Sequence, residues 1–147
     1  MFKIYDYRRF FHFIIFYSYI LLGDIVMDIL FKMAEEEMLE LHHPYVGTEH
    51  LFLAYLKMFD NQFITYDKFK NNIIKVIGQS YKRSEVILYT PILRKIKNES
   101  SNIYEAIISI LTDDNCIAYN LLLVNGYDIE KIYLDILKND KLREYEW

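Results

Sequence analysis

Cysteine, proline and glycine are all scarce in this chain of 147 residues, and each scarcity excludes a class of structure. The single cysteine, Cys116, excludes an internal disulfide framework and suits a reducing, cytoplasmic compartment. The four glycines stand singly, so neither a phosphate-binding P-loop nor a dinucleotide-binding fingerprint can be assembled. We therefore expect no disulfide-stabilised fold and no nucleotide or other cofactor.

An excess of basic residues is also lacking. The chain has 17 Lys and Arg residues and 21 Asp and Glu residues, which gives a formal net charge of −4. A field of this sign does not concentrate nucleic acid, so we expect no nucleic-acid partner. The hydrophobic content of 53% is ample for a core in a chain with the length of one ordinary domain.

Helices are predicted for most of the chain, because its only prolines, Pro44 and Pro91, fall where elements are expected to begin. No convincing pair of alternating, strand-like segments is present. The predicted fold class is therefore all-α.

In the first half, apolar residues recur at helical spacing from Asp24, a candidate N-cap, to about Glu40. Thr48 is predicted to cap the next helix. A further helix is predicted from about Tyr66 to Ile77, ending at Gly78. In the second half, we predict helices at about 91–98, 103–112, 114–125 and 128–138, with Asp114 and Asp128 as N-caps and Gly126 as a stop.

Two stretches of the chain echo one another. The segment 45–54 (YVGTEHLFLA) has a degraded copy at 103–108 (IYEAII), in which the glutamate and the apolar pair that follows are in register. One helical unit cannot bury its apolar face alone, and a second copy provides the surface against which that face packs. We therefore predict two related halves, with Glu49 and Glu105 at equivalent helix starts across a pseudo-two-fold axis.

Four landmarks in a fixed order carry a family resemblance. They are the acidic run 34–37 with Leu41 and His43, the run 47–51 (GTEHL), the run 88–91 (LYTP) and the run 120–131 (NLLLVNGYDIEK). Together they resemble the N-terminal domain of the Clp ATPases, especially ClpC, over roughly residues 24–138. The resemblance implies a first Clp repeat at 24–78, a linker at 79–87, a second repeat at 88–138 and a C-terminal tail at 139–147.

The resemblance implies a stand-alone, non-catalytic module that binds proteins. Such a module would recognise substrates or adaptors of a Clp chaperone-protease, or modulate that machine. In ClpC-like domains, the glutamate of each G-T-E-H motif and a threonine from the start of the same repeat form a pocket for phosphoarginine. A carboxylate can accept a bidentate pair from the guanidinium, while hydroxyls and helix N-terminal amides hold phosphate. By this resemblance the binding residues are Glu49, Glu105, Thr90 and Thr48.

The two implied pockets are not equal. The first carries Asp24 in place of the threonine, and a second carboxylate there would repel phosphate. The second keeps Thr90 but has Tyr104 in place of the neighbouring hydroxyl. We therefore expect any phosphoarginine binding to be tighter at Glu105 than at Glu49.

The same residues have simpler structural interpretations. Glutamate in the first turn of a helix stabilises it by about 0.3–1 kcal/mol through the helix dipole. Thr90 before Pro91 is also typical of an N-cap. The histidines His42, His43 and His50 lack the spacing of metal ligands, so we expect no metal, and those near a helix end are expected to contact its last carbonyls. Cys116 is expected to be buried, and no catalytic arrangement supports the alternative of a small enzyme.

The N-terminal extension, residues 1–23, lies outside the resemblance. Residues 10–22 are aromatic and aliphatic and follow Arg8 and Arg9. As a helix they would span about 20 Å, short of the roughly 30 Å of a bilayer core. We expect a helix docked on the domain. The alternatives are a membrane-associating or secretion-related segment, a partner interface, and a start of translation at Met27.

Overall fold

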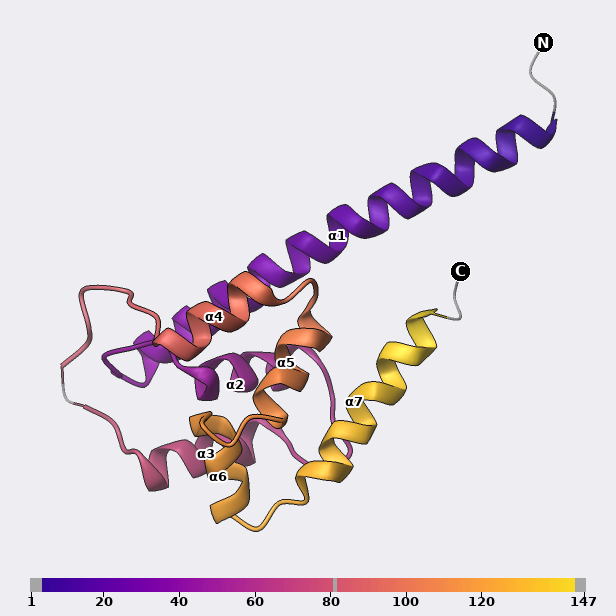
Figure 1. Ribbon diagram of the computed structural model, residues 1–147. Coiled ribbons are helices and arrows are strands. Elements are labelled where there is room, and N and C mark those ends of the chain that lie inside the picture. Colours follow the sequence, from indigo (N-terminus) through magenta and orange to yellow (C-terminus); the bar gives the residue numbers. More distant parts are fainter. Residues whose placement is uncertain (1–3, 81, 145–147) are drawn as a thin grey trace.

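The computed structural model describes the backbone of residues 4–80 and 82–144, and the side chains of residues 22–80 and 82–139. Within these residues the regular elements are all α-helices, as predicted, and the only strand-like pairing is an isolated parallel bridge between Val46 and Tyr89. Figure 1 shows their arrangement. In chain order they are α1 (Ile4–Glu40), α2 (Thr48–Met58), α3 (Tyr66–Val76), α4 (Pro91–Glu99), α5 (Ile103–Leu111), α6 (Ile117–Val124) and α7 (Ile129–Glu144).

Helix α1 is longer than the sequence predicted, with 37 residues starting at Ile4. The prediction of Asp24 as its N-cap is wrong, because the helix runs through Asp24 without a break. No proline interrupts the segment, and a helix that has been nucleated extends at little cost. In Figure 1 the N-terminal part of the α1 ribbon extends beyond the other helices.

The predicted docking of residues 10–22 depends on side chains that, up to residue 21, lie outside the described ones. Their backbone belongs to α1 and is helical. Among the helices of the described residues, none carries an apolar stretch long enough to cross a bilayer.

Helix α2 forms the centre of the bundle. It packs against α1, α3, α5 and α6, and its residues from Thr48 to Leu56 are all buried. The ring of Phe52 meets Phe69 of α3 edge to face, with centroids 5.0 Å apart, and stacks near Tyr55. Each such buried ring contributes about 1.5–3 kcal/mol of transfer free energy. A helix buried on all sides fixes the positions of the groups at its start.

Two of the predicted helix starts in the second half are confirmed. The Thr90 hydroxyl accepts the backbone N–H of Leu93 at 3.3 Å, with Pro91 as the first helical residue. The Asp128 carboxylate likewise accepts the backbone N–H of Lys131 at 3.2 Å. Both caps satisfy amides that a helix start leaves without partners.

The predicted helix stops at Gly78 and Gly126 are also confirmed. Gly78 follows the last residues of α3 with φ +87°, and Gly126 follows α6 with φ +78°. These left-handed conformations favour glycine and end each helix.

The predicted start of the sixth helix is wrong. Helix α6 begins at Ile117 rather than near 114, and its N-cap is Cys116, whose side chain makes no capping bond. Asp114 therefore does not cap it. The amide of Ala118 is capped from another part of the fold, as described below, which sequence spacing cannot reveal.

Candidate functional site at two helix starts

The two glutamates taken from the resemblance both lie in the first turns of helices. Glu49 is the second residue of α2, and Glu105 is the third residue of α5. Their surroundings differ: Glu49 is 5% exposed, whereas Glu105 is exposed to solvent. Asp24, expected beside the first pocket, is an exposed residue within α1.

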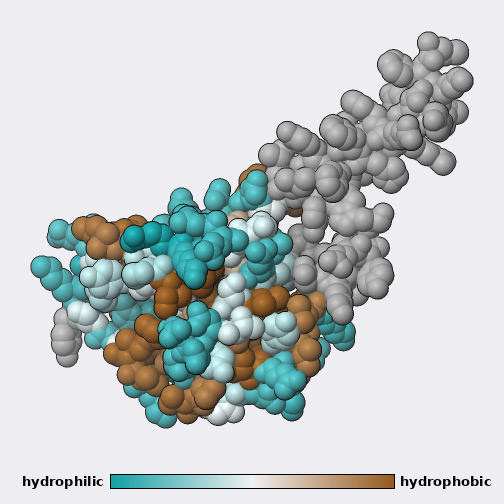
Figure 2. Space-filling model, in the orientation of Figure 1, coloured by the Kyte–Doolittle hydropathy of each residue, from teal (hydrophilic) through white to brown (hydrophobic). Residues whose placement is uncertain are grey.

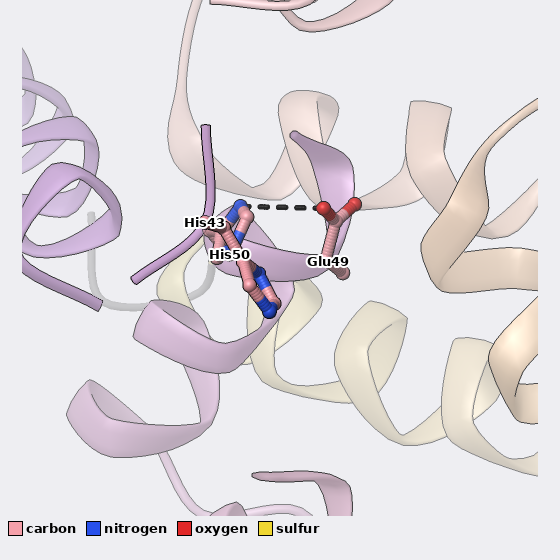
Figure 3. A group of neighbouring side chains, drawn as sticks. All are labelled: His43, Glu49 and His50. Carbon is pink, nitrogen blue, oxygen red and sulfur yellow. Dashed lines mark hydrogen bonds and ion pairs between the residues drawn. The ribbon is translucent and has the colours of Figure 1, made fainter. Parts of the chain in front are cut away.

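Glu49 belongs to a buried cluster with His43 and His50 (Figure 3), which sequence spacing did not predict. His43 lies in the turn after α1, and the chain reverses between it and α2. The reversal brings His43 Nδ1 to 2.8 Å from His50 Nε2, although the two residues are seven positions apart. The G-T-E-H run with a histidine four positions before its glycine was the available signal.

The hydrogen bonds of this cluster fix where the ring protons lie. The Gly47 backbone N–H donates to His50 Nδ1 at 2.9 Å, so the proton of the neutral His50 ring is on Nε2. That Nε2–H donates to His43 Nδ1 at 2.8 Å, and His43 Nε2–H then donates to the Gly78 carbonyl at 2.7 Å. A single assignment with two neutral rings satisfies the whole chain of bonds, which we call the histidine chain.

A metal ion does not fit the cluster in this arrangement. One candidate ligand atom from each of His43, Glu49 and His50 lies within 4.8 Å of the others, and these residue types bind zinc. However, all four ring nitrogens already have hydrogen-bond partners. The 2.8 Å between His43 Nδ1 and His50 Nε2 is a hydrogen-bond distance, whereas two nitrogens on a tetrahedral zinc ion are about 3.3 Å apart.

The Glu49 carboxyl group is held in a buried, poorly partnered position. Burial raises its pKa to about 7, against a smaller opposing effect from its own backbone N–H. Its Oε2 has no hydrogen-bond partner, and its Oε1 is 3.3 Å from His50 Nδ1. That contact is not an ion pair at neutral pH, because burial, followed by the neighbouring His43, lowers the pKa of His50 to about 3.

Gly47 leaves room for the Glu49 carboxyl in its observed position. Its φ of −115° is open to any residue, so its role is not conformational. A Cβ at position 47 would lie 2.5–2.8 Å from the carboxyl atoms of Glu49, closer than real Cβ contacts allow. The glycine therefore gives the Glu49 carboxyl its space.

Thr48 does not cap its own helix, which corrects the sequence prediction. The N-cap of α2 is Gly47. The Thr48 hydroxyl turns instead to the start of α6, where it accepts the backbone N–H of Ala118 at 3.2 Å. Cys116 is buried next to it, as predicted, and burial with the nearby charge of Asp113 raises the pKa of its thiol to about 11. While it is buried, a thiol with so high a pKa is a weak nucleophile at neutral pH.

The histidines after α1 do not contact the last carbonyls of that helix, as had been expected. His43 bonds to the Gly78 carbonyl, and His42 Nδ1 is 3.0 Å from the Ser80 carbonyl. Both carbonyls belong to the segment after α3. The left-handed backbone of His42, with φ 57°, ends α1 and turns the rings away from it.

Glu105 lines a cavity of about 680 Å³, which we call the α4–α5 groove. Its walls are α4, α5 and the turn that precedes α6. Three carboxylates line it, from Glu99, Glu105 and Asp113, together with the Lys95 ammonium group and the apolar side chains of Ile92 and Ile96. Thr90 is not among the lining residues; its hydroxyl caps α4.

Comparison with protein-family models gives no match for this chain, and comparison with curated proteins gives none either.

Proposed function

We propose that the chain is a non-catalytic, protein-binding module of the Clp N-terminal type, acting in the cytoplasm. In this proposal it recognises substrates or adaptors of a Clp chaperone-protease, or modulates that machine. The α4–α5 groove is the observation that carries it, because an exposed glutamate at a helix start opens onto a concave surface. Concave sites with a few convergent polar groups are the usual places where proteins take up ligands.

The chemistry of the groove suits an arginine side chain of a partner. The aliphatic stem would pack on Ile92 and Ile96, while the guanidinium would pair with the Glu105 carboxylate. If that arginine is phosphorylated, Lys95 is the cation in the groove that can face the phosphate. The buried Glu49 offers no comparable access, which supports the expectation that the Glu105 site binds more tightly.

Calorimetric titration with two matched peptides tests this proposal. One peptide carries a phosphoarginine and the other an arginine at the same position. We expect binding of at least one peptide by the wild-type protein, weakened about tenfold or more in Glu105→Gln, because a charge-assisted hydrogen bond contributes about 1.5–3 kcal/mol. Glu49→Gln is the matched control and should keep the wild-type affinity at pH 6, where the Glu49 carboxyl of the wild-type chain is mostly neutral. Equal binding by wild type and Glu105→Gln, or no binding of either peptide, would reject the proposed site.

A further inference from the structure

Glu49 lies at a junction where separate parts of the chain meet. The turn after α1 contributes His43, the segment after α3 contributes the Gly78 carbonyl, and the start of α6 contributes Cys116. The proposed binding groove uses none of these groups. A buried carboxyl that takes no part in binding, and whose Oε2 has no partner, is an unexplained cost to the fold.

We propose that Glu49 is a proton-binding switch that holds the starts of α2 and α6 together while its carboxyl is neutral and loosens them when it ionises. The neutral carboxyl suits this nearly buried site. An ionised carboxylate there would have Oε2 without a partner and Oε1 near His50 Nδ1, whose lone pair is already taken by the Gly47 N–H. The backbone N–H of Glu49 itself offsets only a smaller part of the cost of burial. Burying a charge in this way is costly.

No cation among the described side chains lies beside Glu49 to relieve that charge. The titratable groups around it are His50 on its own helix, His43 in the preceding turn and Cys116 at the start of α6, with Asp113 beside the thiol. None of the histidine nitrogens has a free position for a proton, and the other two groups are neutral or negative.

Other helices bring ionisable groups to the C-terminal end of α2. Glu37 of α1 contacts Lys57, the tenth residue of α2, and Tyr66 of α3. Tyr104 of α5 packs on Phe59, just after α2 ends. None of these described groups is a cation beside Glu49, so burial dominates and raises the pKa of its carboxyl to about 7.

The start of α6 is the element that can respond. Its own N-cap residue makes no side-chain cap, so the Thr48 hydroxyl, one residue before Glu49, holds its Ala118 amide. The Glu49 side chain is 7% exposed while these two helix starts are together, and their separation would let more water reach the ionised carboxylate. The turn before α6 also supplies Asp113 and Asn115 to the α4–α5 groove, so separation would move a groove wall. This last coupling rests on the proposed function, whereas the response of the junction does not.

Alkylation of Cys116 measures the junction directly, because Cys116 is the only cysteine and is fully buried when the junction is closed. The rate is measured for the full wild-type chain and for Glu49→Gln between pH 5.5 and 8.5, without any peptide. Dividing one rate by the other removes the ordinary effect of pH on thiol ionisation. We expect the ratio of wild-type to variant rate to rise about tenfold or more across this range. Glu105→Gln, the matched exposed control, should follow wild type at every pH.

A ratio that stays flat with pH would overturn the proposal, even if the groove binds its peptides. If Glu49→Gln does not fold, the wild-type chain is compared with a short peptide containing the Cys116 sequence. The protection of Cys116 relative to that peptide must then fall by the same factor as pH rises, and constant protection would overturn the proposal. A switch with no effect on peptide affinity would confine the inference to the junction and remove only its link to the groove.

Discussion

Helices α2 and α5 each carry a glutamate in the first turn, Glu49 and Glu105, yet the two side chains lie in different surroundings. In α5 the Asn102 side chain accepts the Glu105 backbone N–H at 2.9 Å, and the Glu105 side chain remains in solvent. In α2 there is no such cap, and the Glu49 side chain is folded inward beside His50. The difference shows that glutamates at similar positions in a first turn can lie in different surroundings, because the packing of neighbouring segments determines whether the carboxyl is exposed to solvent or buried beside a hydrogen-bond network.

Removing the His50 ring, which has no counterpart in α5, should lower the free energy of unfolding more than any other change proposed here. In His50→Ala, the Gly47 N–H and His43 Nδ1 both lose their partner in a fully buried site. Together with the lost packing, this should lower the free energy of unfolding by about 3–5 kcal/mol. Urea unfolding at pH 7 measures the loss. Glu105→Ala, at the exposed start, should stay within about 0.5 kcal/mol of wild type, and similar losses in both variants would contradict the contrast.

Replacing the buried Glu49 carboxyl should raise the free energy of unfolding above neutral pH, whereas most substitutions lower it. Glu49 has a pKa of about 7 in the folded chain against 4.5 as its ordinary value, so the folded state binds more protons between these values. Its contribution to stability is full below about pH 4.5 and is lost as pH rises through 7. Glu49→Gln should therefore match wild type near pH 4.5 and be more stable at pH 8 by about 1–3 kcal/mol.

The neighbouring His50 gives the opposite slope and must be separated from this effect. Its pKa is about 3 in the folded chain against 6.5, so its contribution is present above pH 6.5 and lost as pH falls towards 3. That limb should remain in Glu49→Gln. Unfolding curves at several pH values, with Glu105→Gln as control, show both limbs; a Glu49→Gln curve parallel to wild type would sink the assignment.

Adding a side chain at Gly47 should lower the stability by a smaller amount, and only when the Glu49 carboxyl is present. Gly47→Ala places a Cβ against the Glu49 carboxyl and should lower the free energy of unfolding at pH 7 by about 1–2 kcal/mol. In a Glu49→Ala background the same substitution should cost almost nothing, because the clashing atoms are gone. A double-mutant cycle measures the coupling, and additive losses would exclude this steric role for Gly47.

Removing the side-chain cap of α5, which α2 lacks, should have the smallest effect on stability. Asn102→Ala removes the bond to the Glu105 amide and should cost about 1 kcal/mol. Thermal unfolding measures it, with Asn102→Asp as the control that retains a capping oxygen. If the alanine variant is as stable as wild type, side-chain capping does not distinguish the two starts.

Sequence patterns predicted the parts of the fold that depend on local chemistry. The helical class, the caps by Thr90 and Asp128 and the stops at Gly78 and Gly126 follow from neighbouring residues alone, and all are confirmed. The continuous α1 was missed because aspartate is a common N-cap residue, so Asp24 was interpreted as a helix start. In the structure the helix already includes the residues before Asp24, so no free amides remain there for it to cap.

The candidate site could be predicted only in part. The positions of Glu49 and Glu105 in first turns follow from the motif and its echo. The burial of Glu49 depends on the approach of His43 and on the turn that precedes α6, and the cap from Thr48 to Ala118 joins residues 70 positions apart. Contacts of such separation leave no periodic signal. The pseudo-two-fold relation of the halves stays a prediction.

The histidine chain also has a consequence for the order of folding. It ties the start of α2 to the segment after α3, and the bond from His43 to Gly78 spans 35 positions. The His43 Nε2–H does not gain its partner at Gly78 until the intervening chain has closed, so the loop entropy is lost before that bond completes the histidine chain. We therefore expect the histidine chain to form after the transition state. Weakening it through His43 should then speed unfolding and leave the rate of folding almost unchanged.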